Sequence, residues 1–373
     1  MSKKWLCAGV LLQLLFVGSC NVRPSDKNKV QAVQKENPKG VALQLRVPEK
    51  AIARLEPHDG EVQGLVFSPD NKKVASFYRR KPTRLWDAGT GKLIRELEFA
   101  LALEQRFDLG YLGRGKILAA TFRHMPTQNE LFQISEAGQW ENIGQDQPEM
   151  TWYPNCMPDD DSVPVVYYQT KKAFIGFWAI SKRFVSRSFE ANGNAAVDLV
   201  LSSDRKKIAA LVNDFDNELC IIVYDVATGR KLRRLPAPPT FGWPRFAFSA
   251  NDKSLITGPH SVQPGTPSFF EHWDLTADNA RVIVQCENEY IPRNRKRLTA
   301  FHFLGERLAA FGRDSTIHLV DPSNGKDIGK LKGHEEDITC LAVSLDKRYL
   351  ASGGDDKYVL IWDLEALGQA RNR

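Results

Sequence analysis

The most informative segment of the sequence reads Gly333-His334-Glu-Glu-Asp-Ile-Thr-Cys-Leu-Ala-Val-Ser-Leu-Asp346, followed by Leu350-Ala-Ser-Gly-Gly-Asp-Asp356 and by Ile361-Trp362-Asp363. A near copy, His58-Asp-Gly-Glu-Val-Gln-Gly-Leu-Val-Phe-Ser-Pro-Asp70, leads to Arg84-Leu-Trp86-Asp87. One constant offset aligns the two segments without a gap, with His58 on His334 and Trp86 on Trp362. Self-similarity of this kind is the signature of a repeat architecture.

Weaker copies of the same unit fill the interval between the two segments. They are Val197–Asp204 with Ile221–Asp225, Arg245–Ser249 with Leu255–Gly258 and His272–Asp274, and Leu308–Gly312 with Asp314–Asp321. Residues 100–190 keep only strand patterns and the two unit ends Leu131-Phe-Gln133 and Phe177-Trp-Ala179, and they leave room for two units of ~40–45 residues each. The sequence therefore predicts seven units.

The turns between the expected strands follow one pattern. Gly91, Gly229 and Gly325 each end a short polar turn that starts at an aspartate, where a hairpin needs a positive φ. Each turn is followed by an alternating run such as Leu93–Leu97, which predicts an outer strand with one face in water. Each unit is thus expected to have four strands.

These segments resemble the repeats of the WD-repeat family. The resemblance implies an all-β fold, a seven-bladed β-propeller of four-stranded antiparallel blades, over residues 51–373. Ala51–Glu56 stands before His58 with no inner strands of its own, and ten residues follow Asp363. The N-terminal strand is therefore expected to complete the last blade and close the ring, which removes exposed sheet edges.

The family resemblance also implies a buried structural hydrogen-bond set of His, Ser or Thr, Asp and Trp in each repeat. In the last repeat the set is His334, Ser352, Asp356 and Trp362. The first repeat has His58, Ser76 and Trp86, with Arg80 at the Asp position. The sixth repeat keeps Asp314 and has Val320 in place of Trp. These residues are expected to be structural.

The N-terminus predicts export. Two lysines precede an apolar run from Trp5 to Val17, which at 1.5 Å per residue covers about 20 Å and is too short for a ~30 Å bilayer core. Val17-Gly18-Ser19-Cys20 resembles the bacterial lipobox, which implies a signal peptide over residues 1–19 and a membrane-anchoring lipid on Cys20. Residues 20–50 are expected to be a flexible linker. Ordinary cleavage, giving a soluble secreted or periplasmic protein, is the alternative.

The charge distribution argues against a nucleic-acid partner. The formal net charge of the 373-residue chain is +6, of which residues 1–19 carry +2 and residues 21–50 carry +4. The expected propeller is therefore neutral overall, whereas a nucleic-acid-binding domain carries its positive charge on the folded surface. Of the cysteines outside the leader and Cys20, Cys220 and Cys340 fall in expected strands, which favours buried thiols over a disulfide.

No catalytic, cofactor or metal motif stands out. The chain has no Gly-x-Ser-x-Gly elbow, no His-x-x-x-His pair and no Gly-rich phosphate loop. The run Asp159-Asp160-Asp161 lacks the spaced ligands of an EF-hand loop and is expected to be a solvated loop rather than a Ca²⁺ site. We therefore expect a protein that is not an enzyme and that holds no cofactor or metal.

The loops that depart most from the repeat are the candidate binding sites, because insertions on one face often mark binding. They are Met125–Glu130, Asn155–Val163, Gly258–Phe270 and Tyr290–Arg297. Their candidate partner-binding residues are Asp160, His260, Gln263, Arg293 and Arg295. The sequence predicts a monomeric, membrane-tethered scaffold that binds protein or peptide partners. An enzyme, or a carbohydrate- or peptide-binding protein, that uses the central channel is the alternative, and a structural envelope component is a third reading.

Overall fold

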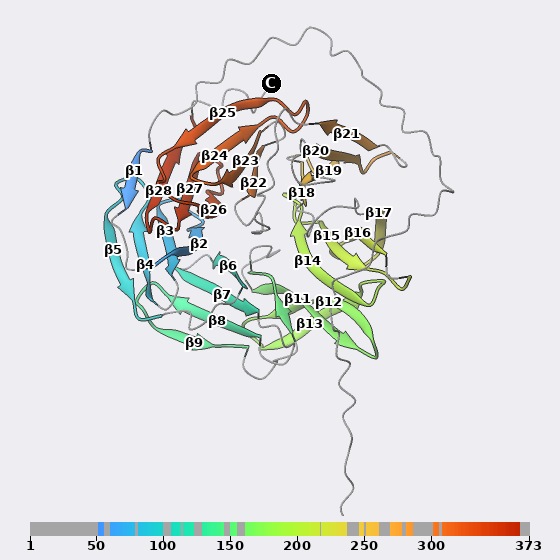
Figure 1. Cartoon of the computed structure of the whole chain (residues 1–373). Coiled ribbons are helices and arrows are strands. Elements are labelled where there is room, and N and C mark those ends of the chain that lie inside the picture. The colour runs from blue at the N-terminus through green and yellow to red at the C-terminus, as the bar shows by residue number, and fades with distance from the viewer. Residues whose placement is uncertain are drawn as a thin grey trace, which may run out of the picture. The chain divides into compact units, whose positions relative to one another are not determined.

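In the computed structural model the chain is an all-β propeller whose blades are four-stranded antiparallel sheets. The structure describes residues 51–55, 60–78, 81–99, 106–112, 115–122, 129–144, 150–154, 161–216, 218–236, 246–249, 251–260, 269–277, 281–285, 301–305 and 308–365. Figure 1 shows the strands β2, β6, β14, β22 and β26 nearest the centre. Within the described part of the chain, no helix has the length and apolar character needed to cross a bilayer.

The described strands form seven sheets, numbered here in chain order. Sheet 1 contains β2 (Val62–Phe67), β3 (Lys73–Tyr78), β4 (Lys81–Asp87) and β5 (Leu93–Leu97). Sheet 2 contains β6 (Arg106–Leu112), β7 (Lys116–Phe122), β8 (Glu130–Ser135) and β9 (Trp140–Asn142). Sheet 3 contains β10 (Thr151–Trp152), β11 (Ser162–Gln169), β12 (Lys172–Ala179) and β13 (Phe184–Glu190).

Sheets 4 to 7 repeat this order. Sheet 4 contains β14 (Ala195–Leu201), β15 (Lys207–Asn213), β16 (Leu219–Asp225) and β17 (Lys231–Pro236). Sheet 5 contains β18 (Phe246–Phe248), β19 (Ser254–His260), β20 (Phe269–Asp274) and β21 (Arg281–Gln285). Sheet 6 contains β22 (Phe301–Gly305), β23 (Leu308–Arg313), β24 (Thr316–Val320) and β25 (Asp327–Lys332). Sheet 7 contains β26 (Ile338–Val343), β27 (Tyr349–Gly354), β28 (Val359–Asp363) and β1 (Ala53–Leu55).

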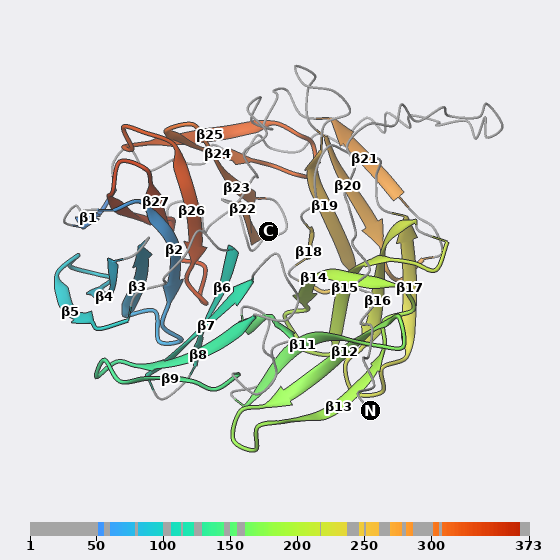
Figure 2. The same ribbon diagram turned by 60° about the horizontal axis from the view of Figure 1, so that its bottom comes forward.

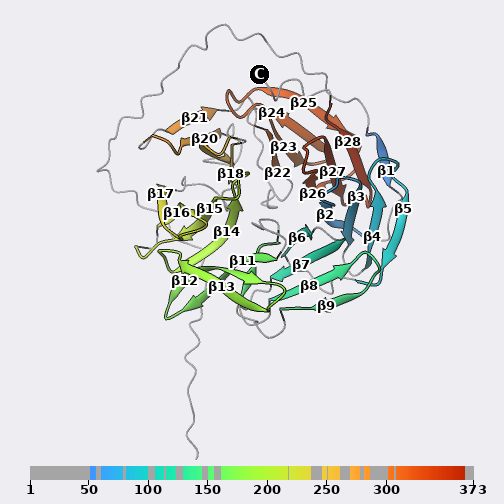
Figure 3. The same cartoon turned by 180° about the vertical axis from the view of Figure 1, so that it is seen from behind.

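Sheet 7 is the one that combines distant parts of the chain. β1 pairs with β28 in antiparallel register, with Ala53 opposite Ile361 and Leu55 opposite Val359. Figures 2 and 3 show β1 at the outer side of this sheet from two further directions. Arg54 lies over the ring of Tyr358, with its guanidinium carbon 3.6 Å from the ring centroid, and its side chain reaches Glu335 at 3.4 Å.

The core lies between neighbouring sheets rather than inside any one of them. One buried cluster joins Val62 and Trp86 of sheet 1 to Cys340 and Ile361 of sheet 7. Corresponding clusters join sheets 1 and 2, 2 and 3, 3 and 4, 4 and 5, and 6 and 7. Between sheets 5 and 6, His272 Nε2 lies 2.6 Å from the carbonyl oxygen of Pro322.

The expected turn chemistry is confirmed at the three glycines, since Gly91, Gly229 and Gly325 have φ values of 70°, 69° and 73°. The expected outer strand over Leu93–Leu97 forms, but its predicted burial pattern is wrong, because only Leu97 is buried. The outermost strand of a sheet has one neighbouring strand, so little apolar surface is available to cover its first residues. Cys220 and Cys340 are buried free thiols, as the sequence predicts. Cys7, Cys20, Cys156 and Cys286 lie outside the described residues.

The sequence predicts the position of the repeat end correctly in sheet 3 and wrongly in sheet 2. In sheet 3, Trp178 lies opposite Val163 and Ala179 opposite Ser162, which matches Trp86 and Asp87 of sheet 1. In sheet 2, the matching positions are Ile134 and Ser135 rather than the predicted Leu131-Phe-Gln133. A strand pattern of period two looks the same after a shift of two residues, so the turn at Gly138 sets the register instead.

In sheets 1, 4, 5 and 7, the turns between the first and second strands share one construction. A serine hydroxyl donates to the Asp or Asn two residues later, at 2.6 Å for Ser68 and Asp70 and at 2.6 Å for Ser344 and Asp346. The next residue has a positive φ, and in two sheets it is an Asn or Asp that reaches the neighbouring sheet. Asn71 Oδ1 accepts from the backbone N–H of Leu345 at 2.8 Å, and Asp252 accepts from two N–H groups of sheet 4.

This turn-to-turn contact gives a test of how strongly the turns tie sheets 7 and 1 together. We expect Asn71→Gly to lower the free energy of unfolding by about 1 kcal/mol, because the variant keeps the positive φ and loses one hydrogen bond. Asn71→Asp keeps an acceptor oxygen at the same place and is expected to lose less than half as much. Urea titration of both variants measures the difference. Equal losses in the two variants would contradict a role for the side-chain oxygen.

Candidate functional site

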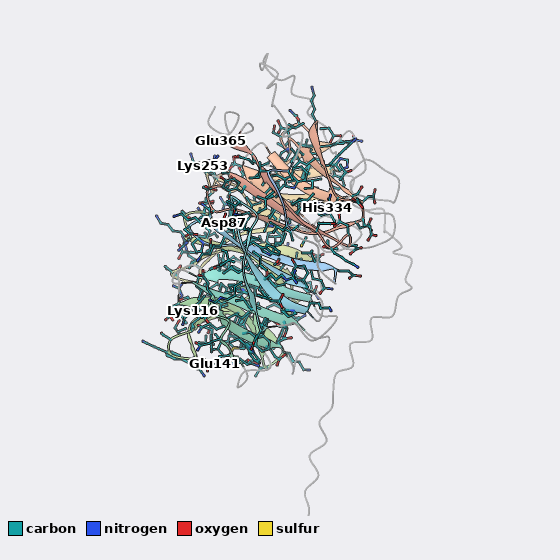
Figure 4. All side chains as sticks on the ribbon, turned by 90° about the vertical axis from the view of Figure 1, so that its left-hand side faces the viewer. Asp87, Lys116, Glu141, Lys253, His334 and Glu365 are labelled. Atoms are coloured by element: carbon teal, nitrogen blue, oxygen red, sulfur yellow. The ribbon has the colours of Figure 1, made fainter. Side chains whose placement is uncertain are left out.

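Two opposite faces of the propeller follow from the strand directions. We call the face with the turns between second and third strands, and with the connections between sheets, the loop face. His334 and Asp356 belong to it, because they lie in the β25–β26 connection and the β27–β28 turn. The turn face carries the remaining turns. Figure 4 shows His334 on the opposite side of the molecule from Asp87, Lys116 and Lys253 of the turn face.

The structure brings His334, Ser352, Asp356 and Trp362 together beneath the loop face of sheet 7. His334 Nδ1 lies 2.9 Å from Asp356 Oδ2, and His334 Nε2 lies 2.8 Å from Ser352 Oγ. The carboxylate can only accept, which assigns the ring proton to Nδ1, so Nε2 accepts from the serine hydroxyl. Trp362 Nε1 donates to the same hydroxyl oxygen at 3.0 Å. Each polar side-chain atom in this series of hydrogen bonds therefore has a partner.

Asp356 also holds the loop backbone. Its carboxylate accepts from the N–H of Glu335 at 3.0 Å and from the N–H of Tyr358 at 3.1 Å. Burial raises the pKa of Asp356, but the hydrogen bonds from His334 and from these N–H groups outweigh it, so its pKa is lowered below the ordinary value. The carboxylate thus stays charged and fixes both the β25–β26 connection and the β27–β28 turn.

The set has no access to a substrate. The side chains of His334 and Asp356 are 1% and 4% exposed, and Ser352 is fully buried. A Cβ atom at Gly354 would lie 2.8 Å from Asp356 Oδ1 and 2.9 Å from His334 Nδ1, so only glycine fits there. The histidine, serine and aspartate therefore act as a packed structural unit and not as a hydrolytic triad, which needs an accessible nucleophile.

In sheet 1 a tyrosine that the sequence did not predict, Tyr78, contacts the buried serine. Tyr78 occupies the position equivalent to Gly354, and its hydroxyl lies 2.7 Å from Ser76 Oγ. Trp86 Nε1 donates to Ser76 Oγ at 2.7 Å, as Trp362 does to Ser352. Burial raises the pKa of the Tyr78 phenol far above its ordinary value. The constant offset between the two repeats aligns Tyr78 on Gly354, and that signal could have identified the exchange. His58 and Arg80 lie outside the described residues.

The expectation that Asp314 belongs to a buried set is wrong. Asp314 is exposed in the β23–β24 turn with φ 51°, and its carbonyl oxygen accepts from the N–H of Ile338 at 2.8 Å. In sheet 6, Val320 occupies the Trp position, and its side chain has no N–H that could donate to a buried hydroxyl. Apolar packing takes the place of the polar set there.

The predicted partner-binding residues fall largely beyond the described ranges. Asp160, Gln263, Arg293 and Arg295 lie outside them, and His260 is the last residue of β19, where it pairs with Phe269. The strand ends still assign a face to each connection. β7–β8, β19–β20 and β21–β22 are joined on the loop face, whereas Asn155–Val163 joins β10 to β11 on the turn face. The four irregular connections therefore do not all lie on one face, contrary to the expectation from the sequence.

The loop face of sheet 7 carries an excess of acidic side chains. Glu336 is exposed, Glu335 is exposed and pairs with Arg54, and Asp337 and Asp355 are partly exposed, beside the exposed Lys332 and Lys357. The N–H of Asp355 donates to the carbonyl oxygen of Asp337 at 2.9 Å and joins the two loops.

Among the described residues no group of three or more His, Cys, Asp or Glu side chains could hold a metal ion. Asp161 accepts from the N–H and the hydroxyl of Ser181, each at 2.7 Å.

The buried set predicts a measurable loss of stability. His334→Ala removes the hydrogen bonds that the imidazole makes to the buried carboxylate of Asp356 and to the hydroxyl of Ser352, and we expect a cost of about 2–3 kcal/mol at neutral pH. Because the folded pKa of Asp356 is lowered, its contribution is present above the ordinary pKa of aspartate and is lost as the pH falls through the folded pKa. Chemical unfolding of the wild type and of Asp356→Asn across this acidic range checks the sign. A wild-type stability that rises on acidification relative to the variant would contradict it.

Comparisons with known proteins agree with this geometry. Residues 325–363, from the turn before β25 to the end of β28, match the family "WD domain, G-beta repeat". WD repeat-containing protein SL1-17 of Schistosoma mansoni is 25% identical over 165 residues, which cover 44% of this chain and 50% of that protein. Protein FIZZY-RELATED 1 of Arabidopsis thaliana is 34% identical over 110 residues, 29% of this chain and 22% of that protein.

Elongator complex protein 2 of Saccharomyces cerevisiae is 33% identical over 86 residues, which cover 21% of this chain and 11% of that protein. The matched segments thus span half or less of the length of these curated relatives. The matched repeat contains the whole set from His334 to Trp362. The repeat match and the relatives together support a WD-repeat β-propeller.

Proposed function

We propose that the protein is an exported, membrane-tethered WD-repeat scaffold that binds protein or peptide partners on its loop face and has no catalytic role. The observation that carries this proposal is the placement of the irregular connections. Three of the four that depart from the repeat join their strands on the loop face, the same face that carries the loops held by His334 and Asp356 in sheet 7. One relative, Elongator complex protein 2, is by its name a component of a complex.

The chemistry of the loop face favours a basic segment of a partner. Glu335, Glu336, Asp337 and Asp355 lie on adjoining loops of sheet 7, and the backbone that carries them is held by Asp356. Fixed charges of one sign steer an oppositely charged partner and align it on the surface. We expect the propeller to be monomeric and to act without a cofactor.

We also propose that the seven sheets form one closed ring, with residues 51–373 as its domain and β1 as the strand that completes it. The support is the pairing of β1 with β28, together with the contacts of sheet 7 on both its sides, to sheet 6 and to sheet 1. Leu55 is fully buried in the cluster between sheets 7 and 1. A closed ring would leave no sheet without two neighbours.

This closure has a direct test in β1. We expect Leu55→Ala to lower the free energy of unfolding by about 2–4 kcal/mol, because it opens a cavity between two sheets. Arg54→Ala is the control on the same strand, since Arg54 is exposed and its ion pair with Glu335 and its contact with the Tyr358 ring are each worth at most about 1 kcal/mol. Urea unfolding measures both variants. Small and equal losses would show that β1 does not complete the sheet in solution.

The tether is the second part of the proposal. Residues 1–19 would direct export, Cys20 would carry the lipid, and residues 20–50 would link it to the propeller. The support is the lipobox-like Val17–Cys20 and the polar, basic composition of the segment that follows. Each buried CH₂ of an acyl chain contributes about 0.8 kcal/mol, so several chains would hold the protein durably on a membrane.

Cross-linking and capture from salt-washed membranes tests tether and scaffold together. We expect the wild type to stay in these membranes with a partner that co-purifies, and Cys20→Ser to leave them, because a lipid anchor resists salt. Glu336→Lys is expected to reduce capture of the partner, whereas Lys253→Glu on the turn face leaves it unchanged. Retention of Cys20→Ser in salt-washed membranes would disprove the lipid anchor, and capture that is insensitive to the loop face would disprove the binding site.

A further inference from the structure

Large apolar side chains are exposed along one arc of the turn face. Ten such side chains are exposed among the described residues, and six of them, with exposed fractions of 43–69%, lie at the turn-face edge of sheets 7, 1, 2 and 3. We call this set the apolar arc; its members are Ile52, Leu93, Ile94, Trp140, Phe184 and Leu345. Two more, Val282 and Ile283, lie on β21 of sheet 5, and Tyr168 and Phe215 lie toward the loop face.

The arc runs over four consecutive sheets that contact one another there. Leu345 is joined to sheet 1 by its N–H to Asn71. Arg95 of β5 donates to the carbonyl oxygen of Ala137 in sheet 2 at 3.1 Å, and Arg183 of sheet 3 pairs with Glu141 of β9 at 2.5 Å. The four sheets that carry the arc therefore adjoin one another, and the half-exposed Trp140 ring packs edge-on against Phe99 and Phe132 where sheets 1 and 2 meet.

Basic side chains accompany the apolar arc. Lys92 directly precedes Leu93 and Lys182 lies two residues before Phe184, and both are exposed, whereas Arg183 pairs with Glu141 and the exposed Asp346 follows Leu345. The aspartate of the Lys92 turn is engaged by its own backbone, since Asp87 accepts from the N–H and the hydroxyl of Thr90, each at 2.7 Å. Exposed apolar side chains beside cations, with a tryptophan among them, are typical of surfaces that lie in the interface of a bilayer.

The point at which the preceding chain enters β1 favours a membrane as the partner of this surface. Ile52, a member of the arc, enters β1 with its N–H bonded to the carbonyl oxygen of Ile361 at 2.8 Å, toward the turn-face end of β28. The fifty residues before Ala51 include the apolar run and the basic segment 21–50. If residues 21–50 act as the proposed linker, a coil of about 30 residues would reach on the order of 30 Å from Ile52.

We propose that the apolar arc and its neighbouring cations form a peripheral membrane-binding surface that docks on anionic phospholipid. The proposal rests on the proposed tether for bringing a membrane within reach. A tether of this length gives an effective concentration in the millimolar range, so a weak surface suffices once the chain is anchored. Docking on the turn face would turn the loop face away from the lipid and toward soluble partners.

Vesicle binding tests the surface apart from the lipid anchor. The full chain carrying Cys20→Ser is mixed with vesicles of phosphatidylcholine and phosphatidylglycerol, or of phosphatidylcholine alone, and sedimented. We expect binding to the anionic vesicles that falls about tenfold in Leu345→Ser with Phe184→Ser, and by a smaller factor in Lys92→Glu with Lys182→Glu. Phe215→Ser, an equally exposed apolar residue outside the arc, is the matched control and should bind as the parent does.

A second measurement places Trp140 itself. Brominated phospholipid quenches tryptophan emission by contact, and we expect the quenched fraction to drop when Trp140→Phe is introduced into the same background. Equal binding by the arc variants and the parent, an equal loss in Phe215→Ser, or quenching unchanged by Trp140→Phe would overturn the proposal. A protein whose capture depends on the arc while vesicle binding does not would also overturn it. None of these results bears on Cys20, which the salt-washed membranes test separately.

Discussion

No sheet of this propeller can bury its own apolar residues, and this constraint determines the rest of the structure. A four-stranded sheet has two apolar faces, and the shared clusters of the described residues pack six pairs of neighbouring sheets against each other. Stability therefore depends on the interfaces between sheets more than on any repeat motif. This explains why sheets 2 and 3, which keep few of the motif residues, still form regular four-stranded units.

The sequence predicts the fold well because the repeat is carried by spacing. The strands, the turn glycines and the place of Trp178 follow from period-two patterns and from turns that require a positive φ. The failures have equally physical reasons. A shift of two residues preserves the pattern of a strand, which misplaced the end of β8, and a turn aspartate at a repeat position, Asp314, has no histidine before it to hold it in a buried set.

The candidate site was harder to predict than the fold. The polar set of sheet 7 can be identified from spacing alone, but the exchange of Gly354 for Tyr78 depends on which atoms fill one small space. The apolar arc had no signal of its own in the sequence. Its members are separated by up to 293 positions and are brought together by the arrangement of the sheets, and an exposed leucine and a buried one have the same pattern.

The pairing of β1 with β28 has a consequence for the way the chain reaches its native state. β1 is synthesised before every other strand of sheet 7, so this sheet cannot be completed until the chain has been made as far as Asp363. In contrast, the hydrogen-bonded residues Ser76, Tyr78 and Trp86 of sheet 1 all lie in the β3–β4 hairpin and can meet early. Until β28 has been synthesised, β1 therefore lacks its partner strand, and the apolar side chain of Leu55 lacks the cover that sheet 7 provides.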